Sequence, residues 1–242
     1  MRAQFAVLLL ISTVAGADDS FHLDDQRLFN TVDAYHLEPG DFRTEVQAFA
    51  GQPLTQPTLE LRAEVGVREH VQLSFAEDMT QASGHAPTLS AAPISVRYSL
   101  GTIEDQVLGN PAIEATVIPR GNAPTRAQLK LLVAEELMPR VVVAANAYFA
   151  QDLERRTAAG ADGAFGMTGG LSYALLPGLL HVGVEGQLGE AQYGLANYYL
   201  VAALGPDVVL HRGPFALTAS VMANLAPALV SIEPKVTLGF TY

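Results

Sequence analysis

Apolar and polar residues alternate along much of the chain, most clearly in TLELRAEVGVREHVQLSF, residues 58–75. Leu59, Leu61 and Val65 occupy odd positions, whereas most even positions between them carry charged side chains. A period of two predicts a β-strand with one apolar face and one polar face. The apolar positions resume almost at once after Arg68-Glu69-His70, so this stretch predicts two long strands joined by a tight turn.

The alternation recurs along the chain and predicts twelve strands. They lie at residues 42–50, 59–67, 71–75, 93–100, 111–118, 127–135, 140–150, 165–173, 179–189, 197–212, 215–224 and 235–242. Residues 197–212 are apolar at both parities, so no face is assigned to them. Short links alternate with longer polar ones, which is typical of an outer-membrane barrel with both termini in the periplasm. The link at 101–110 is longer than this pattern predicts, and a bulge or a turn of helix is expected there.

Composition supports a membrane barrel. Charged residues make up 16% of the chain, against about 25% in ordinary soluble domains. Mean hydropathy is +0.22, yet the mature chain has no apolar run of the roughly 18 residues that a membrane helix needs. The apolar residues are therefore distributed over alternate positions, as in the strands of a closed antiparallel up-and-down transmembrane barrel, an all-β fold.

The first residues predict export. Arg2 is followed by a mostly apolar run and then by Ala15-Gly16-Ala17, which fits a signal peptide cleaved after Ala17. The expected organisation is a signal peptide at 1–17, a periplasmic segment at 18–41 and an outer-membrane barrel at 42–242. The chain has no cysteine, which excludes disulfide scaffolds and thiolate metal sites. A formal net charge of −11 argues against nucleic-acid binding.

A sheet that crosses a membrane is expected to close into a barrel. Inside hydrocarbon no water satisfies backbone N–H and C=O groups, so an open sheet edge is prohibitively costly. Twelve strands about 4.8 Å apart and tilted by about 40° close into a cylinder on the order of 24 Å across. A soluble barrel with its apolar face inward has the same alternation. The low charge, the signal peptide, the strand count and the aromatic C-terminal strand favour apolar residues facing outward, against bilayer lipid.

Polar residues on the opposite face are then the candidates for lining the lumen. They are Arg43, Glu45, Glu60, Arg62, Glu64, Arg97, Glu114, Lys130, Asn146, His181, Glu185 and Thr218. Because both signs of charge are present, strong ion selectivity is not expected. A salt-bridged plug and a solute path explain these residues equally well.

Small residues predict where the lumen is widest. Residues such as Gly166, Gly170, Ser172, Gly183 and Ser220 share the inward parity of the strands at 165–173, 179–189 and 215–224. The hypothesis is that these strands form the open side of the lumen.

The sequence gives little support to enzymatic or metal chemistry. His181 and Glu185 share one strand face and Ser172 is expected on the neighbouring strand, but this spacing is too wide for a proton relay. His70, His85 and His211 lie in or near links and are expected to be solvated. Asp152, Glu154 and Asp162 are expected in a solvated loop at 151–163, without calcium-loop spacing. No zinc-like spacing occurs, and neither a metal nor a cofactor is expected.

Three stretches carry a family resemblance: FNTVDAYHLEPGDFRTEVQAF at 29–49, LRAEVGVREHVQLSF at 61–75 and LGPDVVLHRGPFALTASV at 204–221. With Asp33, Pro39 and Gly40 before the first strand, the chain resembles the bacterial outer-membrane family labelled MetA-pathway of phenol degradation, and related transporter-like barrels. The resemblance implies a porin-like channel for small solutes, including hydrophobic or aromatic compounds. A closed structural or surface-recognition barrel is the alternative, and a lipid-modifying enzyme is a third.

The end of the chain predicts a partner. Phe240 and Tyr242 look like the closing-strand signal that is read by the outer-membrane assembly machinery, although Tyr replaces the usual terminal Phe or Trp. The expected partners are therefore this machinery, outer-membrane lipid and an unidentified small solute.

Overall fold

The computed structural model describes residues 28–29, 37–50, 57–81, 86–101, 108–121, 124–154, 163–193, 202–225 and 232–242. These residues form strands and turns, and none of their segments is a helix long and apolar enough to cross a membrane. The predicted signal peptide, most of the link at 101–110 and the links around His85 and Asp162 lie outside the described residues.

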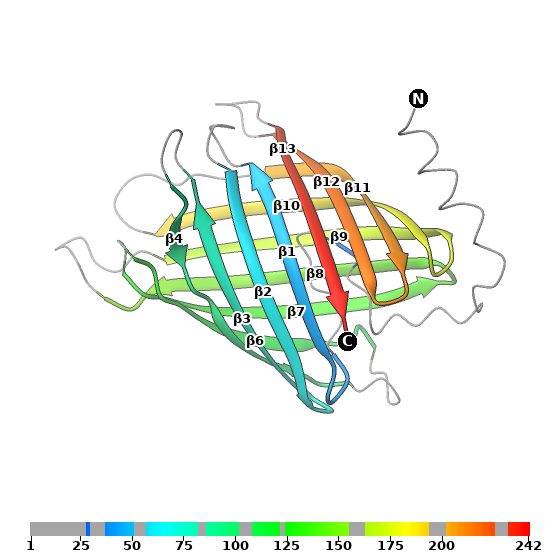
Figure 1. Ribbon diagram of the computed structural model, residues 1–242, viewed down its shortest axis with the longest axis horizontal. Coiled ribbons are helices and arrows are strands. Elements are labelled where there is room, and N and C mark those ends of the chain that lie inside the picture. Colours follow the sequence, from blue (N-terminus) through cyan, green and yellow to red (C-terminus); the bar gives the residue numbers. More distant parts are fainter. Residues whose placement is uncertain are drawn as a thin grey trace.

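The strands form one antiparallel sheet that closes on itself (Figure 1). In chain order they are β1 (Phe42–Ala50), β2 (Pro57–Arg68), β3 (Val71–Thr80), β4 (Thr88–Ala91), β5 (Ile94–Ser99), β6 (Ala112–Ile118), β7 (Arg126–Met138), β8 (Val141–Asp152), β9 (Gly163–Leu176), β10 (Leu180–Tyr193), β11 (Ala202–Arg212), β12 (Phe215–Asn224) and β13 (Ile232–Thr241). Each strand from β5 to β12 pairs with the next. β13 pairs with β1, β1 with β2, and β3 with β5, and the β2–β3 pairing completes the ring.

The short strands β4 and β5 occupy one place in this ring. Both pair with β3, and only Ala92 and Pro93 separate them. Pro93 has no N–H to donate, but its carbonyl still accepts a hydrogen bond from the N–H of Ala76 at 2.9 Å. Counted this way, the barrel wall has twelve strands, and the predicted closed twelve-stranded antiparallel barrel is confirmed.

Alternation fixes which side chains point outward. On β7, Leu131 and Val133 are 53% and 44% exposed, whereas Leu132 between them is 2% exposed. On β6, Ile113 is 42% exposed and its neighbour Glu114 is 6% exposed. The large apolar side chains therefore cover the outside and the charged ones lie inside. This is the reverse of a water-soluble barrel and confirms the faces that parity predicts.

The two ends of the barrel differ. Tight turns join β2 to β3, β7 to β8, β9 to β10 and β11 to β12, all at the end where the C-terminus lies. Gly178 and Gly213 have φ values of 69° and 56° in two of these turns, a conformation that glycine adopts without steric cost. Longer links lie at the other end, as the sequence predicts, and the long link between β5 (Ile94–Ser99) and β6 (Ala112–Ile118) is an exception at the end with the tight turns.

Candidate functional site

The twelve predicted lumen residues all lie on the inner face of the sheet. Nine of them are buried, and Glu60, Arg62 and Lys130 are half-buried. They are not spread evenly around the ring. Most of the charged ones belong to β1, β2, β5, β6 and β7. We call the inner face of β1, β2, β3, β5, β6 and β7 the charged wall and that of β8 to β13 the small-residue wall.

Ion pairs bridge β1 and β2 across the charged wall. Arg43 stands directly opposite Glu64, and its Nη2 lies 2.6 Å from Glu64 Oε2 while its Nε donates to the same oxygen at 2.8 Å. Within β2 itself, Arg62 Nη2 lies 2.8 Å from Glu60 Oε1. Charge-assisted pairs of this kind between neighbouring strands hold long side chains in fixed positions.

A second network crosses β5, β6 and β7. Glu114 faces Arg97 on one side and Lys130 on the other. Arg97 donates from Nη2 and Nε to Glu114 Oε2 at 2.7 and 3.0 Å, and Lys130 Nζ lies 2.9 Å from Oε1. One carboxylate thus joins three strands. A cavity of about 110 Å³ borders this network and is lined in part by Arg62, Glu114 and Lys130.

Asp152 was expected in a solvated loop, and this expectation is wrong. It ends β8 and is buried, because its Oδ1 accepts hydrogen bonds from Arg120 Nη2 at 2.6 Å and from Arg126 Nε at 2.9 Å. Neither arginine was among the predicted lumen residues. Their signal was that Arg126 shares the inward parity of Gln128 and Lys130 on the same strand.

The space above three inward glycines of β9 and β10 is occupied. A Cβ at Gly166 would lie 2.6 Å from the Tyr148 side chain, and a Cβ at Gly170 would lie 2.5 Å from the Phe29 ring. A Cβ at Gly183 would lie close to Asp207 Oδ1. Each glycine faces inward as predicted, but a larger side chain occupies the space above it. The hypothesis of an open side along β9, β10 and β12 is therefore corrected for β9 and β10 and stays a prediction for β12.

Part of the chain before β1 lies inside the barrel. Leu28 and Phe29 are fully buried and pack with Ala134, Val142 and Ala144 of β7 and β8. These three alanine and valine side chains point inward from the wall. The expected periplasmic segment at 18–41 thus places two of its described residues in the lumen.

The same segment crosses the end of the barrel near the termini. Leu37 is fully buried, and its N–H donates to Gln72 Oε1 at 3.0 Å. The N–H of Gly40 donates to the carbonyl of Gly66 at 2.8 Å. A Cβ at Gly66 would collide with the backbone of Glu38, so this glycine allows the crossing.

The structure assigns the faces of β11 that the sequence left open. Asp207, Val209 and His211 point inward and are buried, while Leu204, Val208 and Leu210 are exposed. His211 is 3% exposed, which corrects the expectation of a solvated histidine. Its ring centre lies 5.5 Å from that of His181 on β10, with the ring planes at 83°.

No hydrolase geometry is visible at Ser172. It lies on β9 opposite Gly183 and is buried. Its Oγ has no hydrogen-bond partner among the described residues. A nucleophilic serine needs a base within hydrogen-bond reach, and the geometry shows no such contact.

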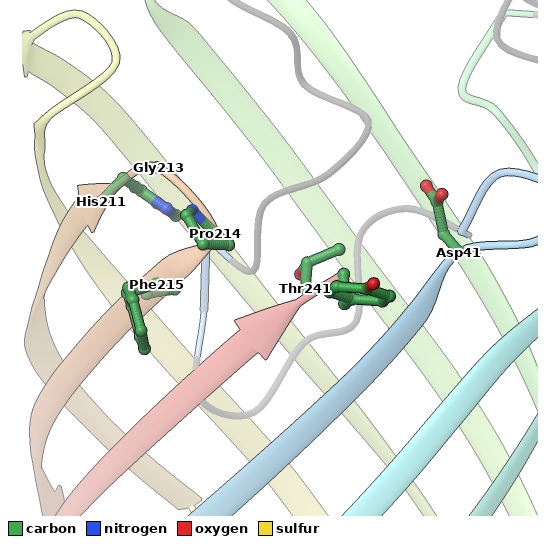
Figure 2. Close-up of a pocket in the computed structure, with 8 residues that line it drawn as sticks. Asp41, His211, Gly213, Pro214, Phe215 and Thr241 are labelled. Carbon is green, nitrogen blue, oxygen red and sulfur yellow. The ribbon is translucent and has the colours of Figure 1, made fainter.

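A second cavity, of about 290 Å³, lies at the end of the barrel near the termini. Figure 2 shows His211 and Phe215 on one side of it and Asp41 on the other. Thr241 and Tyr242 of the last strand complete its lining. This cavity and the one beside Glu114 have no lining residue in common.

Comparison with known proteins identifies the fold. No family model matches the chain, and no curated protein matches it. Among solved structures, an outer membrane channel from Pseudomonas putida F1 is similar with a TM-score of 0.59 and 12% identity, over 87% of this chain and 98% of that one. The NanC porin is similar with a TM-score of 0.58 and 7% identity, over 83% and 98%. The KdgM porin has a TM-score of 0.53 and 10% identity, over 84% and 98%. The chain therefore has a porin-like barrel fold.

Proposed function

We propose that this protein is an outer-membrane channel that admits small solutes. The observation that carries the proposal is the arrangement of the two faces: Leu, Val and Phe side chains cover the outside, and ion-paired and hydroxyl side chains lie inside. An apolar outer surface on a closed sheet is stable in hydrocarbon and unstable in water. The porin-like fold supports the same proposal.

The two ends support an orientation. Outer-membrane barrels have short turns on the periplasmic side and longer loops outside. The end with the tight turns, the start of β1 and Tyr242 then faces the periplasm. The signal peptide predicted at 1–17 is consistent with export to that compartment.

The filled lumen limits what passes. Leu28 and Phe29 occupy space beside β7, β8 and β9. Two cavities lined by described residues, one beside Glu114 and one at the end of the barrel near the termini, have volumes of about 110 and 290 Å³. Large solutes do not fit such spaces, so the proposed cargo is small. The charged wall pairs its cations with carboxylates, which supports weak ion selectivity. The resemblance at 29–49, 61–75 and 204–221 to the phenol-degradation family supports hydrophobic or aromatic solutes.

Single-channel recording tests the proposal. The mature protein, refolded and inserted into planar bilayers, should give discrete unitary current steps. Phe29→Ala should enlarge these steps because it removes a ring that fills the lumen, whereas Phe75→Ala, on the lipid-facing side, should leave them unchanged. An aromatic solute such as benzoate should reduce the current if it shares the path.

One observation favours a second function. Leu28 and Phe29 fill part of the lumen. This packing also fits a second function, that of a closed barrel that displays its outer loops and conducts nothing. Silence in the bilayer from a protein with intact β-sheet circular dichroism, for the native chain and for Phe29→Ala alike, would replace the channel with this alternative.

A further inference from the structure

The cavity near the termini has the build of a small-molecule site. Its volume is about 290 Å³. Ligand pockets are about 300–1,000 Å³, so this one suits a small ligand. The turn at Gly213 and Pro214 lies on one side of it, and Asp41, just before β1, lies on the other (Figure 2). Strand ends that are far apart in the sequence thus enclose one space.

One buried polar side chain in this lining has an atom without a partner. His211 is 3% exposed, and its Nε2 makes no hydrogen bond within the described part of the chain. Its backbone N–H is engaged, because it donates to the carbonyl of Leu179 at 2.8 Å. Its ring packs edge-on against that of His181, with the ring centres 5.5 Å apart. Buried polar atoms in native proteins nearly always have a partner, so Nε2 is a contact point for a polar group in the cavity.

The charge of the lining favours a cation. Asp41 is the one acidic side chain among the described lining residues, which include no lysine and no arginine. An ammonium group forms a charge-assisted hydrogen bond with such a carboxylate, whereas an anionic group is repelled by it. Asp41 and His211 lie on opposite sides of the cavity (Figure 2). A matching ligand therefore has an amine at one end and a hydrogen-bonding group at the other.

Aromatic rings border the same cavity. Phe215 and Tyr242 both line it. The ring centre of Phe240 lies 4.9 Å from that of Phe215 and 6.4 Å from that of Tyr242. Aromatic rings pack well against other rings, and their faces attract cations. A planar ring between the two polar ends of the ligand therefore matches this lining better than a sugar does.

We propose that this cavity binds a small aromatic amine that carries a hydroxyl group on its ring. Asp41 pairs with the ammonium group, and His211 Nε2 bonds to the hydroxyl group. Phe215 and Tyr242 contact the ring between them. The polar contacts at the two ends select the class of ligand, and the volume of the cavity limits its size.

The use of this site rests on the proposed channel function. The cavity lies at the end of the barrel that is assigned to the periplasm, where a solute leaves the lumen. The site then narrows the proposed aromatic solutes to those with a positive charge. Binding itself needs only the folded barrel, whether or not the lumen conducts.

Titration calorimetry with tyramine tests the site on the full mature protein, folded in a nonionic detergent, with empty micelles as the blank. Tyramine has a phenol at one end and an ammonium group at the other, and the native chain should bind it. Phenethylamine lacks the hydroxyl group, and phloretate has a carboxylate in place of the amine. Each analogue should bind about fivefold more weakly or worse, because each leaves one polar group of the site unpaired.

Variants assign the two polar contacts. His211→Ala should weaken tyramine binding by about fivefold or more and remove the preference for tyramine over phenethylamine. Asp41→Asn keeps the shape of the side chain and should remove the preference over phloretate. His70→Ala is the matched control and should bind as the native chain does. His70 lies in the β2–β3 turn outside the cavity, and its buried Nδ1 also has no hydrogen-bond partner among the described residues.

Circular dichroism and heat-dependent gel mobility establish that each variant is folded. Should His211→Ala fail to fold, Asp41→Asn and the two analogues on the native chain carry the test. No tyramine binding by the native chain, equal affinity for either analogue, or native affinity in both variants would each overturn the proposal. Unitary current steps of the native chain without tyramine decide the channel proposal separately, so the two proposals can fail independently.

Discussion

The charged wall and the small-residue wall fill one lumen in different ways. On the charged wall, long side chains from adjacent strands reach one another, as Arg43 reaches Glu64 and Arg97 reaches Glu114. On the small-residue wall, glycine leaves space that a side chain from another strand or from the N-terminal segment occupies, as Phe29 covers Gly170. The first wall is held by electrostatics between neighbours, and the second by shape.

This difference has a consequence for sensitivity to mutation. An ion pair inside a barrel fails when one partner is removed, because the other charge remains buried. A glycine packed beneath an aromatic ring is sensitive to the opposite change. Any larger side chain there overpacks the closely packed interior and lowers stability. Truncation should therefore damage the charged wall most, and enlargement should damage the small-residue wall most.

The largest expected effect is at the seam where the two walls join, between β1 and β13. Phe42 and Tyr242 exchange backbone hydrogen bonds of 2.9 and 2.7 Å, and the Phe240 ring lies 4.9 Å from that of Phe215. Deleting residues 240–242 should abolish the heat-modifiable barrel in outer-membrane fractions. Tyr242→Phe keeps the ring and should assemble normally. A folded, membrane-inserted deletion variant would show that closure and recognition by the assembly machinery do not depend on this end.

The next effect tests the charged wall. Arg43→Ala should lower the free energy of unfolding by about 3–5 kcal/mol, because it removes the 2.6 Å pair with the buried Glu64 and leaves that carboxylate with the longer contact to Arg62 Nη1, 3.8 Å away. Arg62, whose side chain is 23% exposed, is the control, and Arg62→Ala should cost under about 1 kcal/mol. Urea unfolding in detergent, followed by circular dichroism, measures both. Equal costs would mean that burial does not set the strength of these pairs.

The smallest effect tests the small-residue wall. Gly170→Ala places a methyl group 2.5 Å from the Phe29 ring and should cost about 1–3 kcal/mol through overpacking. Gly169→Ala is matched in chemistry, but its nearest atom, the carbonyl oxygen of Ala144, is 3.5 Å away, so it should be close to neutral. The same urea experiment compares them. If the two alanines have the same cost, Phe29 does not pack on Gly170 in solution.

Much of the fold was predictable because parity is a local property of the chain. The sequence predicts that Leu131 and Lys130 lie on opposite faces of their strand, and in the structure Leu131 points outward and Lys130 inward. On β11 the apolar residues occupy both parities and hide the pattern. Asp207 and His211 share one parity there, and this was the signal for the inner face.

The contents of the lumen were not predictable in the same way. Inward glycines indicate that space exists, but nothing local to Gly170 specifies that Phe29, far away in the sequence, fills it. Likewise, the parity of Glu114 indicates an inward carboxylate, whereas its two cations depend on strand register. Contacts between segments far apart in the sequence depend on strand register and on closure of the sheet, and neither can be read from the local pattern.

The position of Leu28 and Phe29 also restricts the order of events during biogenesis. These residues are enclosed by a barrel whose first and last strands, β1 and β13, are joined by backbone hydrogen bonds between Phe42 and Tyr242. Either the segment with Leu28 and Phe29 is already inside when β1 and β13 pair, or it is threaded into the closed barrel afterwards. A bulky domain fused ahead of residue 28 would block threading, so it would distinguish the two routes.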